Sequence, residues 1–432
     1  MLISSTAART RTLLGTWRQR VSPLLVALAW ACANPSCPAA DTLPNSPRVF
    51  AADAQTLATV KTNIASRSAA WQPALRGLIA DADKALATKP VTVMDKKQMP
   101  PSGDKHDYMS QAPYFWRDTN SPDGKYIRRD GERNPESGAD SDAGRLGKVC
   151  GTARTLALAF YFTGDEKYAA RAAGLLRVFF LDPATRMHPN LNYGQGIPGE
   201  VEGRPAGLIS ARSLVDMVDA VGLLAGSKAW TAADQAGMTD WVGNYFTWLT
   251  TSKIGRGEAA ASNNHGTFYD VQATALALFV GKTNEAKAIL LAAREKRIAG
   301  QIQPDGQMPR ELARTLSFNY SVFNLRALIE LATLGQGAGV DLWHYQTPDG
   351  RSLLQALEFM APYADPKREW PFKQIHAPNR PDLGELMLRA AVEYPGSKPI
   401  QAALKFYQAG DFANKPARLY LKMAPPESAL AH

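Results

Sequence analysis

Two amides and an imidazole stand side by side in the segment Ser-Asn-Asn-His-Gly at residues 262–266. They lie shortly before a stretch with helical spacing of apolar residues that begins at Val271. One Asn or Ser side chain is enough to cap the first turn of such a helix. Because polar groups cost free energy when they are buried without partners, the group Asn263, Asn264 and His265 needs a further reason. Its residue types suit a site that binds an acidic substrate and moves a proton.

A second segment, residues 309–321, combines arginines with a tyrosine directly before another helical stretch. Arg314 stands six residues before Tyr320, and a nearby cation lowers the pKa of a phenol, ordinarily about 10, by favouring the phenolate. Tyr320 is therefore a candidate for proton transfer with Arg314 as its activator, and Arg310 is a candidate substrate ligand. Taken alone, the segment is explained more simply by a surface ion pair between Glu311 and Arg314 and by a core tyrosine.

Residues 96–140 are rich in Pro, Gly, Asp, Tyr and Trp and show no helical period. Aromatic rings stack on sugar rings while neighbouring polar groups bind the sugar hydroxyls. The segment therefore predicts a loop-rich substrate-binding surface, and an aromatic cover over the core is the alternative. The candidate substrate-binding residues in this segment are His106, Tyr108, Gln111, Tyr114 and Trp116.

Amides and an arginine recur in the glycine-rich connection at residues 187–204. Asn192, Gln195 and Arg204 suit the binding of hydroxyls and carboxylates, because arginine makes charge-assisted hydrogen bonds to carboxylates. A plain turn-rich connection is the competing interpretation. Tyr269, four residues after the imidazole, is a further candidate for substrate binding.

From Gly144 onward the chain is rich in Ala and Leu at helical spacing, and no stretch alternates apolar and polar residues as a half-buried strand does. Near residues 160–166 and 278–285, a helix ends at a glycine, and an Asp or Asn after a short turn can cap the next helix. These are helical hairpins. Stacked hairpins form a solenoid or, when they close, an α/α-toroid. The predicted fold class is therefore all-α.

The first forty residues have the layout of a secretory signal peptide. Four arginines and no acidic residue accompany a short apolar run at residues 23–31, and small residues follow up to Ala40. The run is too short to cross a bilayer, which takes about 20 apolar residues. We therefore expect residues 1–40 to be removed and residues 41–432 to form a single domain, periplasmic or secreted, without stable membrane insertion. Lipidation at Cys32 is the alternative.

The charge and the cysteines fit an exported protein with an anionic partner. Loss of the four signal-peptide arginines lowers the formal net charge from +9 to +5, and a basic protein captures an acidic substrate more readily. Cys150 then stands alone, so no disulfide can form within the mature chain, which suggests a Gram-negative periplasm. No Lys/Arg-rich run with interleaved aromatic residues occurs, which argues against a nucleic-acid partner.

Motifs of several common enzyme classes are missing from the sequence. It has no G-x-G-x-x-G after a strand pattern, no Walker A motif, no H-E-x-x-H, no Cys/His metal spacing and no G-x-S-x-G. Nothing visible in the sequence requires a metal or another cofactor.

Taken together, the polar segments resemble the alginate lyase superfamily, most closely its glucuronan and alginate lyase branch with a toroidal α/α-barrel. The resemblance covers about residues 105–324, half of the chain, and its specific parts are the Asn-Asn-His and Arg-x5-Tyr segments. It implies an α/α-toroid, as a closed or incomplete barrel, and matches Asn264, His265, Arg314 and Tyr320 to the family's site residues. Mannuronate lyases of the superfamily usually place the arginine one residue further from the tyrosine, so a strict mannuronate specificity is not implied.

The resemblance also implies a reaction, the β-elimination of a β-1,4-linked uronic-acid polymer such as glucuronan or mannuronate-type alginate. The enzyme removes the C5 proton and expels the C4 oxygen, and hydrogen bonds to the neighbouring carboxylate make this possible. Asn264 and His265 are expected to neutralise that carboxylate, and Tyr320 beside Arg314 to act as base and acid. Whether His265 takes the proton instead stays open. The alternatives are an α/α-toroid glycoside hydrolase, which needs two carboxylates, and a non-catalytic periplasmic glycan-binding protein.

Overall fold

The computed structural model describes residues 46–138, 141–407 and 412–424. The expected signal peptide at residues 1–40 lies outside the described residues, and so does Cys32 within it. The residues in these three ranges belong to one compact unit. Within the described ranges, no helix combines the length and the apolar character needed to cross a bilayer.

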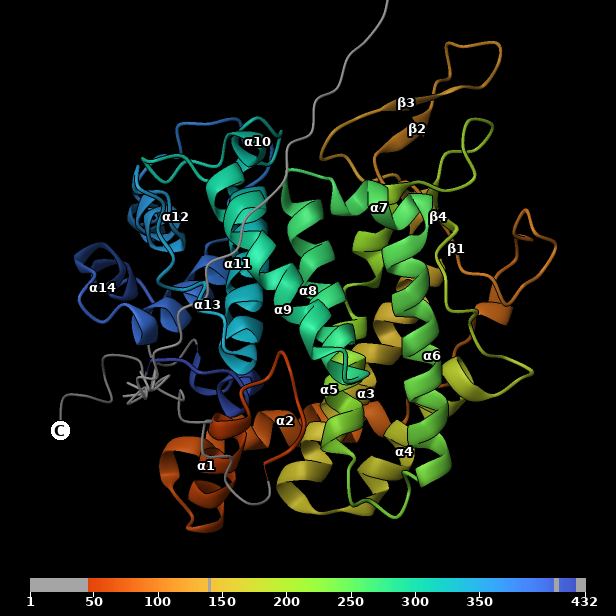
Figure 1. The fold of residues 1–432 in the computed structure, drawn as a ribbon, viewed down its shortest axis with the longest axis horizontal. Helices are drawn as coiled ribbons and strands as arrows, with labels where there is room; N and C mark the ends of the chain where they lie inside the picture. The colour runs from red at the N-terminus through yellow and green to blue at the C-terminus, as the bar shows by residue number, and fades with distance from the viewer. Residues whose placement is uncertain (1–45, 139–140, 408–411, 425–432) are drawn as a thin grey trace, which may run out of the picture. The chain divides into compact units, whose positions relative to one another are not determined.

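Helices make up most of the described structure (Figure 1). Their bounds are α1 (Ala54–Ala65), α2 (Gln72–Leu86), α3 (Asp142–Thr163), α4 (Glu166–Leu176), α5 (Leu214–Leu223), α6 (Ala232–Thr251), α7 (Lys253–Ala259), α8 (Asn264–Phe279), α9 (Thr283–Ala293), α10 (Pro309–Leu312), α11 (Ser317–Ala338), α12 (Leu353–Met360), α13 (Arg380–Glu393) and α14 (Lys398–Leu404).

The strands are short and belong to the loops. Strand β1 (Met109–Gln111) pairs in parallel with β4 (Tyr193–Gly196), and β2 (Phe115–Arg117) pairs in antiparallel register with β3 (Tyr126–Arg128). Figure 1 shows β2 and β3 projecting above α7, and β1 and β4 lying beside α6 and α7. The two loop segments that the sequence marks as substrate-binding are thus joined through β1 and β4.

The hairpin turns follow from their capping residues. Helix α3 ends at Gly164, whose φ of 72° is left-handed and suits glycine, and Asp165 then caps α4 by accepting a hydrogen bond from the Lys167 amide. The second hairpin turns at Gly281, with φ of 80°. There α9 already begins at Thr283, so the side-chain cap expected from an Asn or Asp is absent at its start.

The helices pack as an inner and an outer set. Neighbouring inner helices contact one another in the order α3, α5, α8, α11 and α13, while α2, α4, α6, α9, α12 and α14 pack against their outer sides. Helix α8 is buried on almost every side, which explains its lack of an amphipathic pattern. The expected all-α fold, an α/α-toroid of helical hairpins, is confirmed.

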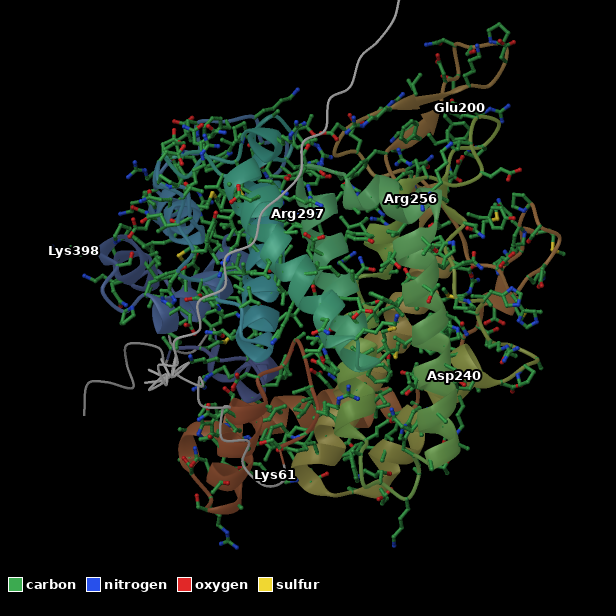
Figure 2. The ribbon with its side chains drawn as sticks, viewed as in Figure 1. Lys61, Glu200, Asp240, Arg256, Arg297 and Lys398 are labelled. Atoms are coloured by element: carbon green, nitrogen blue, oxygen red, sulfur yellow. The ribbon has the colours of Figure 1, made fainter. Side chains whose placement is uncertain are left out.

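Charged side chains lie both on the surface and in the core of this fold (Figure 2). Lys61 on α1, Asp240 on α6 and Lys398 on α14 are exposed. Arg297, in contrast, is 3% exposed and pairs with Asp270 of α8, with Nε 2.7 Å from Oδ2. A buried ion pair of this kind constrains where the chain segments that carry it must lie.

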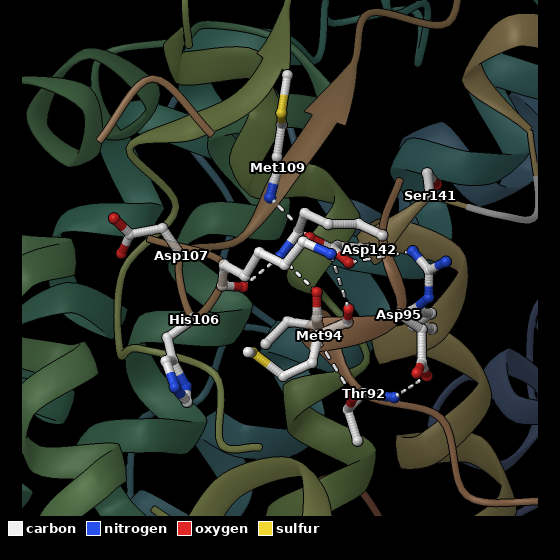
Figure 3. Close-up of polar contacts among 12 residues, drawn as sticks. Thr92, Met94, Asp95, His106, Asp107, Met109, Ser141 and Asp142 are labelled. Carbon is white, nitrogen blue, oxygen red and sulfur yellow. Dashed lines mark hydrogen bonds and ion pairs between the residues drawn. The ribbon is translucent and has the colours of Figure 1, made fainter. Parts of the chain in front are cut away.

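A second buried charge network fixes the loop-rich segment that begins at residue 96 to the start of α3 (Figure 3). The ammonium of Lys96 lies 3.0 Å from Asp142 Oδ2 and also donates to the Val93 carbonyl. Asp142 accepts a further hydrogen bond from the Met109 amide at the start of β1, a contact drawn in the close-up. Arg145 approaches its other oxygen at 3.2 Å. The aspartate at the first position of α3 also faces the positive end of the helix dipole.

We predict that Asp142→Ala lowers the free energy of unfolding by about 3 kcal/mol or more, because it leaves the buried ammonium of Lys96 without the carboxylate that it pairs with. Urea denaturation followed by circular dichroism measures this. The matched control is Asp81→Ala, which removes an ion pair with Lys84 whose side chains are 57% and 81% exposed and should change stability by less than about 1 kcal/mol. Equal effects of the two substitutions would show that the Asp142 network does not hold the loop.

Candidate functional site

The inner helices surround one large cavity of about 1210 Å³. This is larger than the usual site for a single small molecule, and it suits a chain of several sugar residues. Helices α3, α5, α8, α11 and α13 all contribute lining residues. Nine of the residues expected from the sequence line it: Gln111, Tyr114, Gln195, Arg204, Asn263, Asn264, His265, Arg314 and Tyr320.

The first turn of α8 brings the two amides and the imidazole into the cavity. Asn263 is the N-cap residue, and its side-chain oxygen accepts a hydrogen bond from the His265 amide at 3.3 Å. A Cβ at Gly266 would lie 2.0 Å from the Ala261 carbonyl and 2.4 Å from Arg297. Only glycine therefore lets the turn pack this closely, and Arg297 holds the preceding loop by donating to the Ala261 carbonyl at 2.6 Å. The positive end of the α8 dipole points at the cavity.

His265 is oriented by a buried carboxylate. Its Nδ1 lies 2.7 Å from Glu258 Oε1, and the Glu258 side chain is 3% exposed. Glu258 therefore keeps a proton on Nδ1 and leaves Nε2 as the ring nitrogen for a ligand. The same carboxylate stabilises the imidazolium that forms when Nε2 takes a second proton, as a buried aspartate does in a catalytic triad.

Asn264 is held by a second buried carboxylate. Glu311 accepts hydrogen bonds from both the backbone amide and the side-chain Nδ2 of Asn264, each at 2.7 Å. Burial raises the pKa of Glu311, and the bonds from Asn264 partly offset this. The side-chain oxygen of Asn264 has no hydrogen-bond partner among the described residues. One N–H of its side-chain amide likewise has no partner there, and both groups lie in a fully buried side chain at the cavity wall.

Arg314 pairs with an aspartate from the substrate-binding loop. The simple interpretation of an ion pair with Glu311 is replaced by a two-pronged contact with Asp130, in which Nη2 lies 2.6 Å and Nε 3.0 Å from the carboxylate. Burial alone would raise the pKa of Asp130, but hydrogen bonds from Arg314 and from the Thr315 amide hold that pKa well below its usual range. The guanidinium of Arg314 also lies 3.6 Å from the ring centre of Tyr320.

Tyr320 donates its hydroxyl proton to the Tyr114 hydroxyl at 2.7 Å. Burial and this neighbour raise the pKa of Tyr320 well above its ordinary value, and Arg314 only partly offsets the rise. Arg314 lies beside the phenol of Tyr320 as expected, but burial outweighs the expected lowering of the Tyr320 pKa. Tyr320 is therefore protonated and acts as a hydrogen-bond donor.

Gln195 and Arg204 form a second polar wall. Gln195 has a left-handed φ of 49°, and its backbone amide donates to the Ser110 hydroxyl. Arg204 donates to both the backbone and the side-chain oxygen of Gln195, at 3.1 and 3.0 Å, and stacks 4.9 Å from the centre of the Phe115 ring. Burial lowers the pKa of Arg204, and nearby Arg128 adds to this. The wall thus offers a cation that has no carboxylate partner among the described residues.

Two expected substrate ligands lie in the core instead of the cavity wall. Tyr108 is completely buried. Tyr269 is 7% exposed and its hydroxyl donates to the Leu249 carbonyl at 3.3 Å. A direct contact of either hydroxyl with a substrate is not available in this arrangement.

Four other residues that the sequence marks as substrate ligands lie outside the main cavity. His106 stacks on His188 with ring centres 5.3 Å apart, and Trp116 donates to the Glu132 carbonyl. Asn192 accepts a hydrogen bond from Trp248 and lines a neighbouring cavity of about 1190 Å³, which shares Gln111 with the main one. Arg310 is exposed on α10.

The three carboxylates that orient the site were not identified from the sequence. Glu258 stands seven residues before His265, on the separate short helix α7, and Asp130 lies 184 residues before Arg314. The sequence favours an ion pair of Glu311 with Arg314, whereas the structure pairs Glu311 with Asn264. Among the described residues, no three side chains of the metal-ligating types come together.

The family model for alginate lyases matches residues 92–370. The crystal structure of an alginate lyase from Bacteroides ovatus is 41% identical to this chain, covers 86% of it and 98% of its own length, and superposes with a TM-score of 0.82. Alginate lyase A1-III of Sphingomonas species A1, as a variant in complex with a tetrasaccharide, is 15% identical, covers 88% and 98% of the two chains and has a TM-score of 0.52. This second likeness is one of fold. No curated protein sequence matches the chain significantly.

We predict that Asp130→Asn lowers the free energy of unfolding at pH 7 by about 2 kcal/mol, the scale of hydrogen bonds to a charged group. Because the folded pKa of Asp130 is depressed, its stabilisation is present above the ordinary aspartate pKa of about 3.9 and is lost as the pH falls further. Urea unfolding from pH 7 to pH 2 measures this, with Asp123→Asn at an exposed position as control. A difference that stays constant down to pH 2 contradicts the ionic role of Asp130.

Proposed function

Because the chain belongs to the alginate lyase family, we propose that this polysaccharide lyase cleaves a β-1,4-linked uronic-acid polymer of mannuronate or glucuronate type by β-elimination. The observation that carries the proposal is the cavity shared by His265 and Tyr320, with the amides of Asn263 and Asn264 beside them. An imidazole and a phenol in one cavity provide a proton acceptor and a proton donor for the same sugar residue.

The uronate carboxylate binds at the start of α8. The helix N-terminus favours an anion there, and the remaining N–H of Asn264 and the amide of Asn263 donate hydrogen bonds to it. Stabilising the charge that develops on the carboxylate lowers the barrier to removing the C5 proton. Glu311 keeps Asn264 in place through its two hydrogen bonds of 2.7 Å.

His265 takes the C5 proton through Nε2. Glu258 holds Nδ1 at 2.7 Å and stabilises the imidazolium that results. The electron pair of the broken C5–H bond forms the C4–C5 double bond, and the C4–O bond breaks. Tyr320 is the less suitable base in this site because its pKa is raised, so the phenolate is scarce.

Tyr320 donates its proton to the departing C4 oxygen. A raised pKa suits this role because the phenol is protonated when the bond breaks. The imidazolium then returns its proton through solvent, and both residues regain their starting states. In mannuronate and glucuronate the C5 proton and the C4 oxygen lie on one face of the ring, so both residues act from that face. They come from helices α8 and α11, which pack against each other.

Neighbouring residues bind the adjoining sugars. Gln111, Tyr114 and Gln195 line the cavity with hydrogen-bonding groups, and Arg204 adds a cation for a uronate carboxylate. The basic net charge supports an anionic polymer as substrate. We propose that the protein meets this polymer in the periplasm or outside the cell, because residues 1–40 have the layout of a signal peptide.

A glycoside hydrolase is less well supported by the same cavity. Hydrolysis needs two carboxylates free to flank the scissile bond. Within the part of the chain that the structure describes, Glu258, Glu311 and Asp130 contact His265, Asn264 and Arg314, and each carboxylate is engaged with the polar neighbour that it orients.

We predict that the purified protein releases products with a conjugated double bond from polymannuronate or glucuronan, seen as rising ultraviolet absorbance. Tyr320→Phe should still bind the polymer but lose turnover by at least about a hundredfold, the scale of general acid catalysis. Hyaluronan completes the panel as a uronate polymer with a different repeat. Cleavage without the chromophore would favour a hydrolase, and binding without cleavage of any uronate would favour a glycan-binding protein.

A further inference from the structure

The cavity continues past the catalytic pair into the inner helices. On α11, Phe323, Arg326 and Glu330 follow Tyr320 among the lining residues, and on α8 Phe268 follows His265. Their spacing of three or four residues keeps them on the same helix faces. Each step of three residues moves about 4.5 Å along the helix, which is comparable to the length of one pyranose residue. One helical turn past the catalytic pair is therefore the place for the next sugar.

Arg212 lies at that level. It follows the 3-10 segment Pro205–Ala211, and its guanidinium carbon lies 5.6 Å from the ring centre of Phe323. The Phe323 ring in turn packs 4.4 Å from Phe268. These two aromatic rings separate the level of Arg212 from that of His265 by one helical turn.

Arg212, like Arg204, lines the cavity without a carboxylate partner among the described residues. Arg154, Arg314 and Arg326 each contact a carboxylate, namely Asp216, Asp130 and Glu385. Arg212 makes a hydrogen bond of 3.1 Å to the Ile209 carbonyl, and within the described ranges it forms no ion pair. Its side chain is nevertheless accessible from the cavity.

The surroundings of Arg212 favour an arriving anion. Burial lowers the pKa of Arg212, and the more distant Glu330 and Asp216 partly offset this. The Arg212 side chain is exposed toward the cavity, and arginine binds a carboxylate through two parallel hydrogen bonds. Aromatic Phe323 beside it offers a surface for the face of a sugar ring.

Helix α3 borders the same cavity without filling it. Gly147 lines the cavity, and a Cβ placed on it would meet no atom within 4 Å. A larger side chain at residue 147 is therefore compatible with the fold, but it would fill space that a sugar would occupy.

We propose that Arg212 binds the carboxylate of a second uronate residue, one position further into the cavity than the residue that is cleaved. This inference rests on the proposed function, since it assumes that the catalytic pair marks the position of the cleaved residue. It makes Arg212 a specificity determinant that favours consecutive uronates over a uronate followed by a neutral sugar.

The test measures binding of tetramannuronate and tetraglucuronate by isothermal titration calorimetry in a Tyr320→Phe background, where the ligand survives. We expect Arg212→Met to raise Kd at least about tenfold, the low end for loss of a hydrogen bond to a charged group, and Arg212→Lys to recover part of the loss. Gly147→Leu should weaken binding at least as much. The matched controls are Arg76→Met and Gly337→Leu, at exposed positions of α2 and α11, which should change Kd less than twofold.

Thermal unfolding checks that each variant is folded, and turnover by the otherwise native enzyme separates the two proposals. If Kd stays within twofold for both Arg212→Met and Gly147→Leu, the Arg212 site is overturned even when the native enzyme cleaves polyuronates. Equal loss of binding in Arg212→Lys and Arg212→Met, with a lower unfolding midpoint in both, also overturns it by indicating a structural role. If the native enzyme forms no unsaturated product but Arg212→Met still weakens binding, the proposed function fails and the Arg212 site stands.

Discussion

The first turn of α8 is the constraint on which the site depends. Its amides and imidazole face the cavity because buried groups on three other chain segments hold them. Glu258 fixes the ring of His265, Glu311 fixes Asn264, and Arg297 fixes the loop before them. Charges taken out of water cost free energy unless they are paired, so each of these groups has few arrangements open to it. The result is a helix N-terminus whose polar groups are set before a substrate arrives, and catalysis gains when no reorganisation is needed.

Ion pairs also join the loop-rich segment that begins at residue 96 to the helical body. Asp130, which follows β3, pairs with Arg314, which in turn lies against the ring of Tyr320. At the other end of the loop, Lys96 pairs with Asp142 at the start of α3. The loop is therefore fixed by one buried and one partly buried ion pair, and short strands alone could not do this because two-stranded pairs are weak in isolation. A rigid loop is needed if aromatic and amide side chains are to line a cavity at defined positions.

The sequence was informative where local chemistry decides the outcome and uninformative where distant segments meet. Helical spacing and the Gly164 turn predicted the hairpins, and residue types alone singled out Asn264 and His265. The partner of Arg314 lies 184 residues away, and no spacing in the chain reveals it. Tyr108 was proposed as a substrate ligand because aromatic loop residues suit sugars, but it is buried in the core. Burial also outweighs the cation beside Tyr320, and burial depends on the whole fold.

The account's central claim is that His265 and Tyr320 act on the same face of one uronate residue whose carboxylate sits at the start of α8. A crystal structure of the Tyr320→Phe variant with tetramannuronate tests this most directly. We expect one uronate with its carboxylate oxygen about 2.7–3.2 Å from the Asn264 amide nitrogen and its C5 hydrogen directed at Nε2 of His265. A tetrasaccharide seated with every C5 turned away from His265, or with no carboxylate near α8, would contradict the account.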